Sequence, residues 1–115
     1  MKQITARAAF ITNRNGNAVA NHTVITTYDE NDVALTRCFQ SFSSIVCVYD
    51  YRTESMTFGR DWDYSNTTMR HLNEFLRHHV PFGYIIGDRV SGSVCAATVR
   101  KAIRDGVVEY DPELV

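Results

Sequence analysis

The chain changes in character near residue 60, and this division most constrains the fold that it can adopt. Before that point, short runs rich in Thr, Val, Ile, Tyr and Phe alternate with turn-forming residues, as is typical of β-strands. After it, apolar residues recur at the spacing of an α-helix. Short connections between the strand segments favour an antiparallel meander. The sequence therefore predicts an α+β fold: a small antiparallel β-sheet of about four or five strands in the N-terminal half, covered on one face by two C-terminal helices.

The N-terminal half contains strand segments that are separated by turns. The strongest turn signal is at 13–17, because its Asn-Gly pair readily adopts positive φ. Further turns are expected at 29–32 and 50–55, where polar residues cluster. The predicted strands are 4–12, 23–28, 33–40, 44–49 and a short one at 56–58. In the fourth strand, simple alternation would place Val46 and Cys47 on opposite faces.

Two amphipathic helices are predicted in the C-terminal half. The first can be capped by Asp63 or Ser65 and ends before Pro81. The second starts near Ser93, and Gly106 suits the position just after its end. The apolar stripe of the first helix consists of Met69, Leu72, Phe75 and Leu76, and that of the second consists of Cys95, Val99, Ala102 and Ile103.

The length of 115 residues fits a single domain that spans residues 1–115. A chain of this size buries about two-thirds of its surface on folding, so a core can form without disulfides or a metal. No Pro/Gly-rich linker interrupts the sequence. The apolar run 84–86, inside the glycine-containing stretch 81–92, is expected to be either an extra short strand or a buried loop.

The charge balance excludes some classes of function. Thirteen acidic residues against twelve basic residues give a net charge of -1. A general polyanion binder needs a surplus of cations, and an acidic DNA mimic needs a surplus of acids. Neither an apolar signal segment nor a run long enough to span a bilayer is present in the sequence, so we expect an intracellular protein without a membrane partner.

The three cysteines, Cys38, Cys47 and Cys95, are odd in number and widely spaced. This pattern fits neither a disulfide framework nor a zinc site. We expect three reduced thiols, at least two of them buried, with Cys95 acting as a small core residue.

The histidines and carboxylates do not form a recognisable catalytic or metal-binding pattern. His71 and His78 share a helix face but lie about 10 Å apart, too far for one metal ion, and both are expected at the surface with His79. Asp61 and Asp63 precede a helix, where N-terminal capping accounts for them. We therefore predict no catalytic residue, metal or cofactor, and no enzymatic activity.

A weak anion-binding pattern precedes the second predicted helix. Backbone amides at a helix N-terminus can bind an anion, and Arg89, Ser91 and Ser93 could assist them. The alternative is an ordinary capped loop, because no phosphate-loop signature follows.

An aromatic pair, Trp62 and Tyr64, lies close to two arginines, Arg52 and Arg60. Such a group could stack single-stranded bases or form a hot spot for a protein partner. It could also pack in the core where the sheet meets the first helix.

Three segments carry a resemblance to known proteins: Thr-Asn-Arg-Asn-Gly-Asn-Ala-Val-Ala-Asn at 12–21, Phe-Gln-Ser-Phe-Ser-Ser-Ile at 39–45 and Trp-Asp-Tyr-Ser-Asn-Thr-Thr at 62–68. In this order they resemble an uncharacterised family of small tailed-bacteriophage proteins, over roughly residues 3–76. In that pattern a Gln usually stands at the position of His22.

The polar content of these segments exceeds what turns alone require. We expect their polar side chains to converge into one surface around Trp62; they are Arg14, Asn17, Asn21, Gln40 and Asp63. Arg52, Arg60, Trp62 and Tyr64 complete the predicted binding residues.

The resemblance, the small size and the neutral charge imply a non-enzymatic, phage-encoded binding protein in the host cytoplasm. It would occlude a host protein, such as a CRISPR effector of a defence system, and thus act as an anti-CRISPR inhibitor. A standard interface needs only about 800 Å² from each partner.

Two alternatives remain open from the sequence. One is binding of single-stranded nucleic acid or a nucleotide signal, through the aromatic pair and its arginines or through the loop 87–93. The other is assembly into a symmetric homodimer, since the edge strands of a small sheet can pair with those of a second copy.

Overall fold

The computed structural model describes residues 3–13, 15–86 and 95–114. It contains one β-sheet whose six strands follow the order of the sequence. Neighbouring strands are antiparallel except for the last pair, which is parallel. The strands are β1 (Thr5–Thr12), β2 (Ala18–Tyr28), β3 (Ala34–Ser41), β4 (Ser44–Asp50), β5 (Ser55–Phe58) and β6 (Glu109–Tyr110). The α+β fold predicted from the sequence is confirmed.

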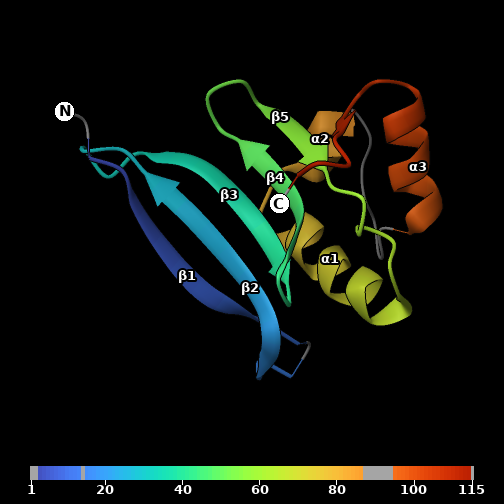
Figure 1. Cartoon of the computed structure of the whole chain (residues 1–115), viewed down its shortest axis with the longest axis horizontal. Coiled ribbons are helices and arrows are strands. Elements are labelled where there is room, and N and C mark those ends of the chain that lie inside the picture. Colours follow the sequence, from blue (N-terminus) through green and yellow to red (C-terminus); the bar gives the residue numbers. More distant parts are fainter. Residues whose placement is uncertain (1–2, 14, 87–94, 115) are drawn as a thin grey trace.

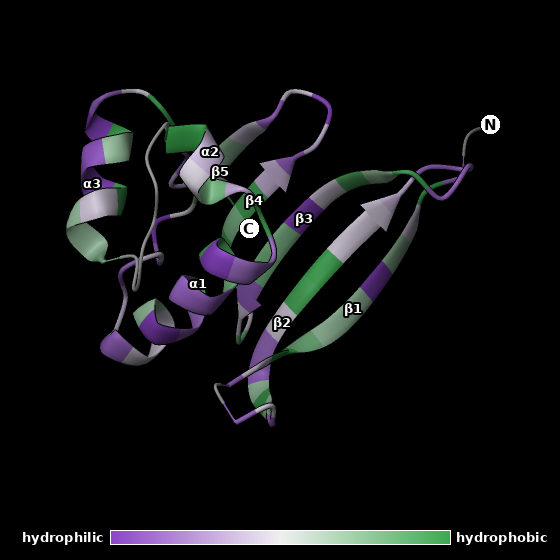
Figure 2. Ribbon diagram, turned by 180° about the vertical axis from the view of Figure 1, so that it is seen from behind, coloured by the Kyte–Doolittle hydropathy of each residue, from purple (hydrophilic) through white to green (hydrophobic). Residues whose placement is uncertain are grey.

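Three helices follow the first five strands: α1 (Asn66–His78), α2 (Phe82–Ile86) and α3 (Ala96–Arg104). α2 and α3 lie beside the half of the sheet formed by β4 and β5, and α1 also contacts β1 and β3, while the far ends of β1 and β2 extend away from the helices (Figure 1). The view from behind shows the same division (Figure 2). Apart from Ile11, the residues of β1 are exposed, so this edge strand is largely open to solvent.

The core lies between the sheet and the helices on one face. Phe39, Cys47 and Phe58 are partners across β3, β4 and β5, and all three are fully buried. Phe75 of α1 stacks on Phe39 with ring centroids 5.7 Å apart, and Phe82 of α2 meets Phe58 at 6.3 Å. Each such side chain contributes about 1.5–3 kcal/mol through burial of apolar surface. Both helices are therefore held on the same face of the sheet.

A register shift in the third strand pair changes the expected alternation in β4. Phe39 pairs with Cys47, whereas the next residue, Gln40, pairs with Ile45, so Val46 has no partner in β3. Val46 and Cys47 are consequently both fully buried, although simple alternation placed them on opposite faces. The irregularity brings Val46 to the side on which α1 lies.

Three elements differ from the sequence-based expectation. β2 begins at Ala18 instead of residue 23, because pairing with β1 extends a stretch that has no clear alternation of its own. The run 84–86 is neither a strand nor a buried loop but part of α2, which begins directly after Pro81, whose carbonyl accepts the Ile85 N–H. β6 was not predicted, since its two residues are ordered only by pairing with β5.

The apolar stripe of α1 is confirmed, because Leu72, Phe75 and Leu76 are buried. The prediction for its histidines is wrong at His71, which is 9% exposed and also lies on the buried side. His78 is exposed, as expected.

The cysteine predictions are partly wrong. Only Cys47 is buried, while Cys38 is half-buried and Cys95 is exposed. Cys95 is the N-cap of α3 and so lies just outside the helix, which removes it from the apolar stripe. Gly106, with φ of 73°, follows the end of α3 as predicted. No helix in the described part of the chain is long and apolar enough to cross a membrane.

Candidate functional site

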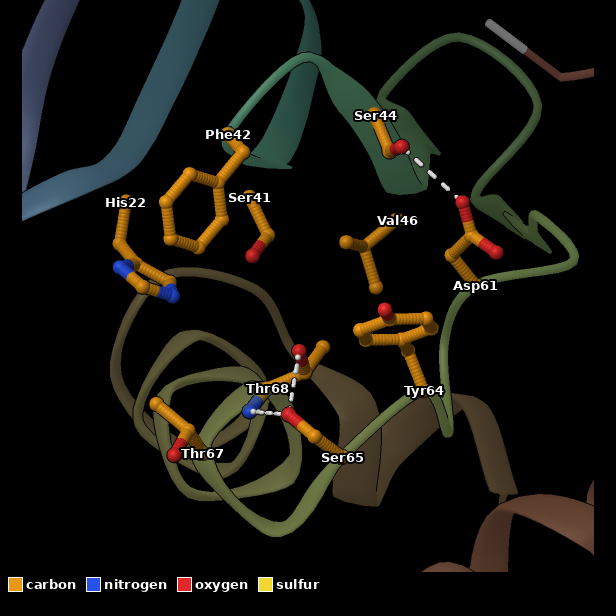
Figure 3. A pocket seen from close by; sticks show the side chains of 10 residues that line it. All are labelled: His22, Ser41, Phe42, Ser44, Val46, Asp61, Tyr64, Ser65, Thr67 and Thr68. Atoms are coloured by element: carbon orange, nitrogen blue, oxygen red, sulfur yellow. Dashed lines mark hydrogen bonds between the residues drawn. The ribbon is translucent and has the colours of Figure 1, made fainter.

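The three segments singled out in the sequence meet at one end of the sheet. His22, just after the first segment, pairs with Ser41 in β3, and Ser41 pairs with Ser44 in β4. The N-terminus of α1 lies against this end and encloses a cavity of about 490 Å³, here called the α1 pocket (Figure 3). Its lining consists of His22, Ser41, Phe42, Ser44, Val46, Asp61, Tyr64, Ser65, Thr67 and Thr68.

The position of Phe42 above the pocket depends on an unusual backbone conformation. Asn21 and Phe42 both have positive φ, 65° and 55°, and the Phe42 N–H donates to the Asn21 carbonyl at 2.7 Å. The Gln40 side-chain amide donates to the Phe42 carbonyl at 2.8 Å. A left-handed conformation of an aromatic residue is strained by about 1–3 kcal/mol. Asn21 and Gln40, which were predicted to bind a partner, thus hold the turn that presents Phe42.

His22 is a buried polar residue at the inner end of the α1 pocket. Its side chain is 3% exposed, and Nδ1 lies 2.8 Å from the carbonyl of Ala20. Because a carbonyl can only accept, Nδ1 carries a proton, which makes Nε2 the acceptor of the neutral imidazole. Nε2 is buried and has no hydrogen-bond partner among the described residues. An unsatisfied buried acceptor is uncommon in a folded protein and calls for a physical explanation.

His71 of α1 lies against His22, with ring centroids 4.4 Å apart. Burial lowers the pKa of His71, and the neighbouring His22 and Arg70 lower it further, against the opposing effect of Glu74. The His71 ring is therefore neutral near pH 7, so it does not repel the His22 ring electrostatically.

The first turn of α1 forms the floor of the pocket. Ser65 is the N-cap, and its Oγ accepts a hydrogen bond from the Thr68 N–H at 3.1 Å. Of the two predicted caps, Ser65 is therefore confirmed and Asp63 is wrong. Asp61 is not a cap either, since the Ser44 hydroxyl donates to its Oδ2 at 3.0 Å and ties β4 to the segment before α1.

The two aromatic residues Trp62 and Tyr64 lie in different environments, one buried and one exposed. Trp62 is 5% exposed and packs edge-on against Phe58 at 6.2 Å, so core packing is confirmed for this residue. The Arg100 guanidinium lies over its ring at 5.7 Å, which leaves no open ring face for base stacking. Tyr64 is 79% exposed, and core packing was the wrong expectation for it.

Of the remaining predicted residues, Arg60 and Asp63 lie beside Trp62, whereas Asn17 lies elsewhere. Asn17 lies in the turn between β1 and β2, where its N–H donates to the Asn13 side chain at 3.1 Å. Asp63 forms an ion pair with Arg100 at 3.8 Å. Arg60 is exposed next to Trp62.

Arg52 lies at the opposite end of the sheet from the α1 pocket, in the turn between β4 and β5. Its guanidinium donates to both carboxylate oxygens of Asp50, at 3.3 and 3.2 Å. This contact lowers the pKa of Asp50. The predicted binding residues are thus spread over separate places, and only part of them lies near the pocket.

Some predictions fall outside the described residues: Arg14, and the anion-binding candidates Arg89, Ser91 and Ser93 with their loop 87–93. Within the residues that the structure describes, no group of three or more His, Cys, Asp and Glu side chains could hold a metal ion.

Sequence reasoning missed His22 and Phe42 as site residues. A signal for His22 was present, because it lies two residues before Val24, and the period of two places both on the core face of β2. A polar residue at such a core position is itself informative. Phe42 gives no comparable signal, because its exposure depends on the turn conformation.

The comparisons with known proteins point to one family. Residues 2–83, which are 82 of the 115 residues and include the whole lining of the α1 pocket, match a family described as "Family of unknown function (DUF8033)". No curated protein and no solved structure matches the chain significantly.

Proposed function

We propose that this chain, which belongs to the DUF8033 family of unknown function, is a non-enzymatic binding protein that occludes a protein partner. The mouth of the α1 pocket would anchor that partner. The observation that carries this proposal is the pair Phe42 and Tyr64, which flank the cavity with 66% and 79% of their surfaces exposed. Exposed aromatic side chains next to a preformed pocket are typical of binding hot spots.

The arrangement of polar groups supports binding over catalysis. Ser41 lies opposite His22 in the strand register, as a nucleophile and its base could. However, Nε2 of His22 makes no hydrogen bond to Ser41 or to any other residue that the structure describes. Asp61, the carboxylate in the lining, is bound by the Ser44 hydroxyl and lies toward the end of the pocket opposite His22 (Figure 3).

We propose that the partner is a protein of a bacterial host cell and that the chain acts in the host cytoplasm. The resemblance of three segments to small tailed-bacteriophage proteins supports this choice. A component of a defence system, such as a CRISPR effector, is the first partner to test. An interface of about 800 Å² on this side is roughly a tenth of the surface of 7312 Å², so a protein of this size can supply it.

Capture of the partner by matched variants tests the proposal. Tagged wild-type protein, the double variant Phe42→Ala/Tyr64→Ala and the control Tyr84→Ala would be incubated with bacterial lysate, with and without nuclease. Tyr84 is a good control because it is 76% exposed but lies on α2, outside the pocket lining. Circular dichroism would confirm that all three proteins are folded.

The expected result is a stoichiometric protein that survives nuclease, binds wild type and Tyr84→Ala, and is lost from the double variant. Equal capture by all three proteins would contradict the assigned surface. Recovery that depends on intact nucleic acid, with affinity falling steeply as salt rises, would favour the nucleic-acid alternative.

The exposed edge of the sheet supports self-association as a further mode of assembly. β1 is eight residues long, contains no Pro or Lys, and carries Phe10 with 58% of its surface exposed. Such an edge can pair with a second copy. Sedimentation of wild type and Ala8→Pro would test this, and a monomer at all concentrations would exclude it.

A further inference from the structure

The lining of the α1 pocket is rich in hydrogen-bond acceptors and contains no Lys or Arg side chain. Of its ten residues, none is Lys or Arg. It contains the carboxylate of Asp61, the buried Nε2 acceptor of His22 and several hydroxyl groups. A ligand that satisfies these groups must bring hydrogen-bond donors with it.

Two opposing charges act on the interior of the pocket. The N-terminus of α1 carries roughly half a positive charge, and no acidic residue in its first turn offsets it. Asp61 carries a full negative charge at the wall. Ser65 already accepts the N–H of Thr68, which reduces the number of helix donors that face the pocket. The carboxylate therefore outweighs the helix end, and the pocket favours a cation over an anion.

Each end of the pocket combines an acceptor with an exposed aromatic ring (Figure 3). At one end, Phe42 lies edge-on to His22 with ring centroids 5.5 Å apart. At the other end, Asp61 and Tyr64 come from the segment before α1. Aromatic faces attract cationic groups, most strongly where water is excluded.

We propose that the α1 pocket binds a cationic hydrogen-bond donor, namely the guanidinium or ammonium group of an Arg or Lys side chain of the partner. The charged group donates to the Asp61 carboxylate and lies against the ring of Tyr64, and the rest of the side chain extends along the pocket toward His22 and Phe42. This inference rests on the proposed function, because it names the chemical group through which the partner is held.

The probes are four small molecules of similar shape, titrated into isotope-labelled wild-type protein and followed by NMR. Two are cationic, N-acetyl-arginine amide and N-acetyl-lysine amide; one is neutral, N-acetyl-glutamine amide; and one is anionic, N-acetyl-glutamate amide. The resonances to follow are those of the His22 imidazole, including its ring nitrogens, and those of the Tyr64 ring.

We expect at least one cationic probe to shift both sets of resonances with a Kd on the order of 1 mM, as suits a fragment of this size. The neutral and anionic probes should bind about tenfold more weakly or not at all, because they cannot form a charge-assisted bond with Asp61. Comparison of the two cationic probes identifies the side chain. Equal or tighter binding of the glutamate amide, or no shift with either cation, would overturn the inference.

Two variants with a matched control keep the test independent of folding. Asp61→Asn preserves the size of the side chain and its acceptor for Ser44, and should weaken cation binding by about tenfold. His22→Phe keeps an aromatic ring at the other end of the pocket, away from the charged group, and should weaken binding less. Asp63→Asn is the control, because Asp63 is exposed and lies outside the lining. An equal loss in all three variants would contradict the assigned contacts.

The outcomes for the two proposals can be told apart. Cation binding without capture of a partner protein would support the pocket chemistry and contradict the proposed function. Capture of a partner that is unaffected by Asp61→Asn, together with no cation binding, would contradict the pocket chemistry alone.

Discussion

His22 of β2 and His71 of α1 lie in contact, with ring centroids 4.4 Å apart and both side chains at most 9% exposed. This contact joins the sheet to the first helix at the inner end of the α1 pocket. It places two imidazole rings inside the fold, where burial disfavours the charged form and lowers the pKa of His71. The stability of the protein is thereby linked to pH.

The first prediction concerns that link. The pKa of His71 is lowered from 6.5, mainly by burial, and that of His79 is lowered in the same way. The unfolded chain then binds more protons than the folded one below pH 6.5, so the stability from these groups is present above that pH and is lost as the pH falls toward their folded pKa values. Thermal melts between pH 8 and pH 5 should show a falling Tm, and His71→Phe should flatten the curve. His78→Gln, at an exposed site, should leave the curve unchanged; a flat wild-type curve would contradict the prediction.

The second prediction concerns the strained turn. Asn adopts positive φ more readily than Phe, so Phe42→Asn should leave the free energy of unfolding unchanged or raise it by about 0.5–1 kcal/mol. The same variant should lose partner capture, because the exposed ring is gone. Urea denaturation gives the free energy. A destabilisation of more than about 1 kcal/mol would show that ring packing on His22 outweighs the strain.

The third prediction concerns the start of α1. Ser65→Ala removes the acceptor for the Thr68 N–H and should cost about 1 kcal/mol of stability. Ser43→Ala, in the exposed β3–β4 turn, is a suitable control and should change stability by less than about 0.5 kcal/mol. Both values come from chemical denaturation, and equal effects of the two substitutions would argue against the cap.

The fourth prediction orders the thiols by reactivity. Hydrogen bonds from Thr98 lower the pKa of the exposed Cys95, whereas burial raises the pKa of Cys38 and raises that of the fully buried Cys47 further. Because the thiolate is the reactive form, iodoacetamide should alkylate Cys95 first, then Cys38, and Cys47 last. Peptide mass spectrometry over time measures the order. Early modification of Cys47 in the folded protein would contradict the placement of its side chain.

The elements that the sequence predicted well are those that depend on neighbours along the chain. The turn at 13–17 follows from Asn-Gly, and the buried face of α1 follows from the spacing of Leu72, Phe75 and Leu76. The end of α3 follows from Gly106. Helix spacing, caps and tight turns are local properties, so a single sequence carries them.

The elements that the sequence did not predict depend on residues far apart in the chain. β6 is ordered by β5, some fifty residues earlier, and Val46 is buried because of a register shift relative to β3. Core packing was one of the alternatives for Tyr64, but α1 begins two residues later, at Asn66, and the Tyr64 side chain is exposed.

The sequence by itself determined the α+β class, the meander of strands and the amphipathic helices, because hydrophobic periodicity and turn chemistry depend on residues that are close together in the chain. It also marked the segments at 39–45 and 62–68, which line the candidate site, and the segment at 12–21, which ends next to it at Asn21. Only the tertiary structure decided that these segments meet in a pocket, that His22 is buried there with an unsatisfied nitrogen, and that Trp62 is withdrawn into the core. Burial and hydrogen-bond satisfaction are set by which elements pack together, and that is a property of the whole fold.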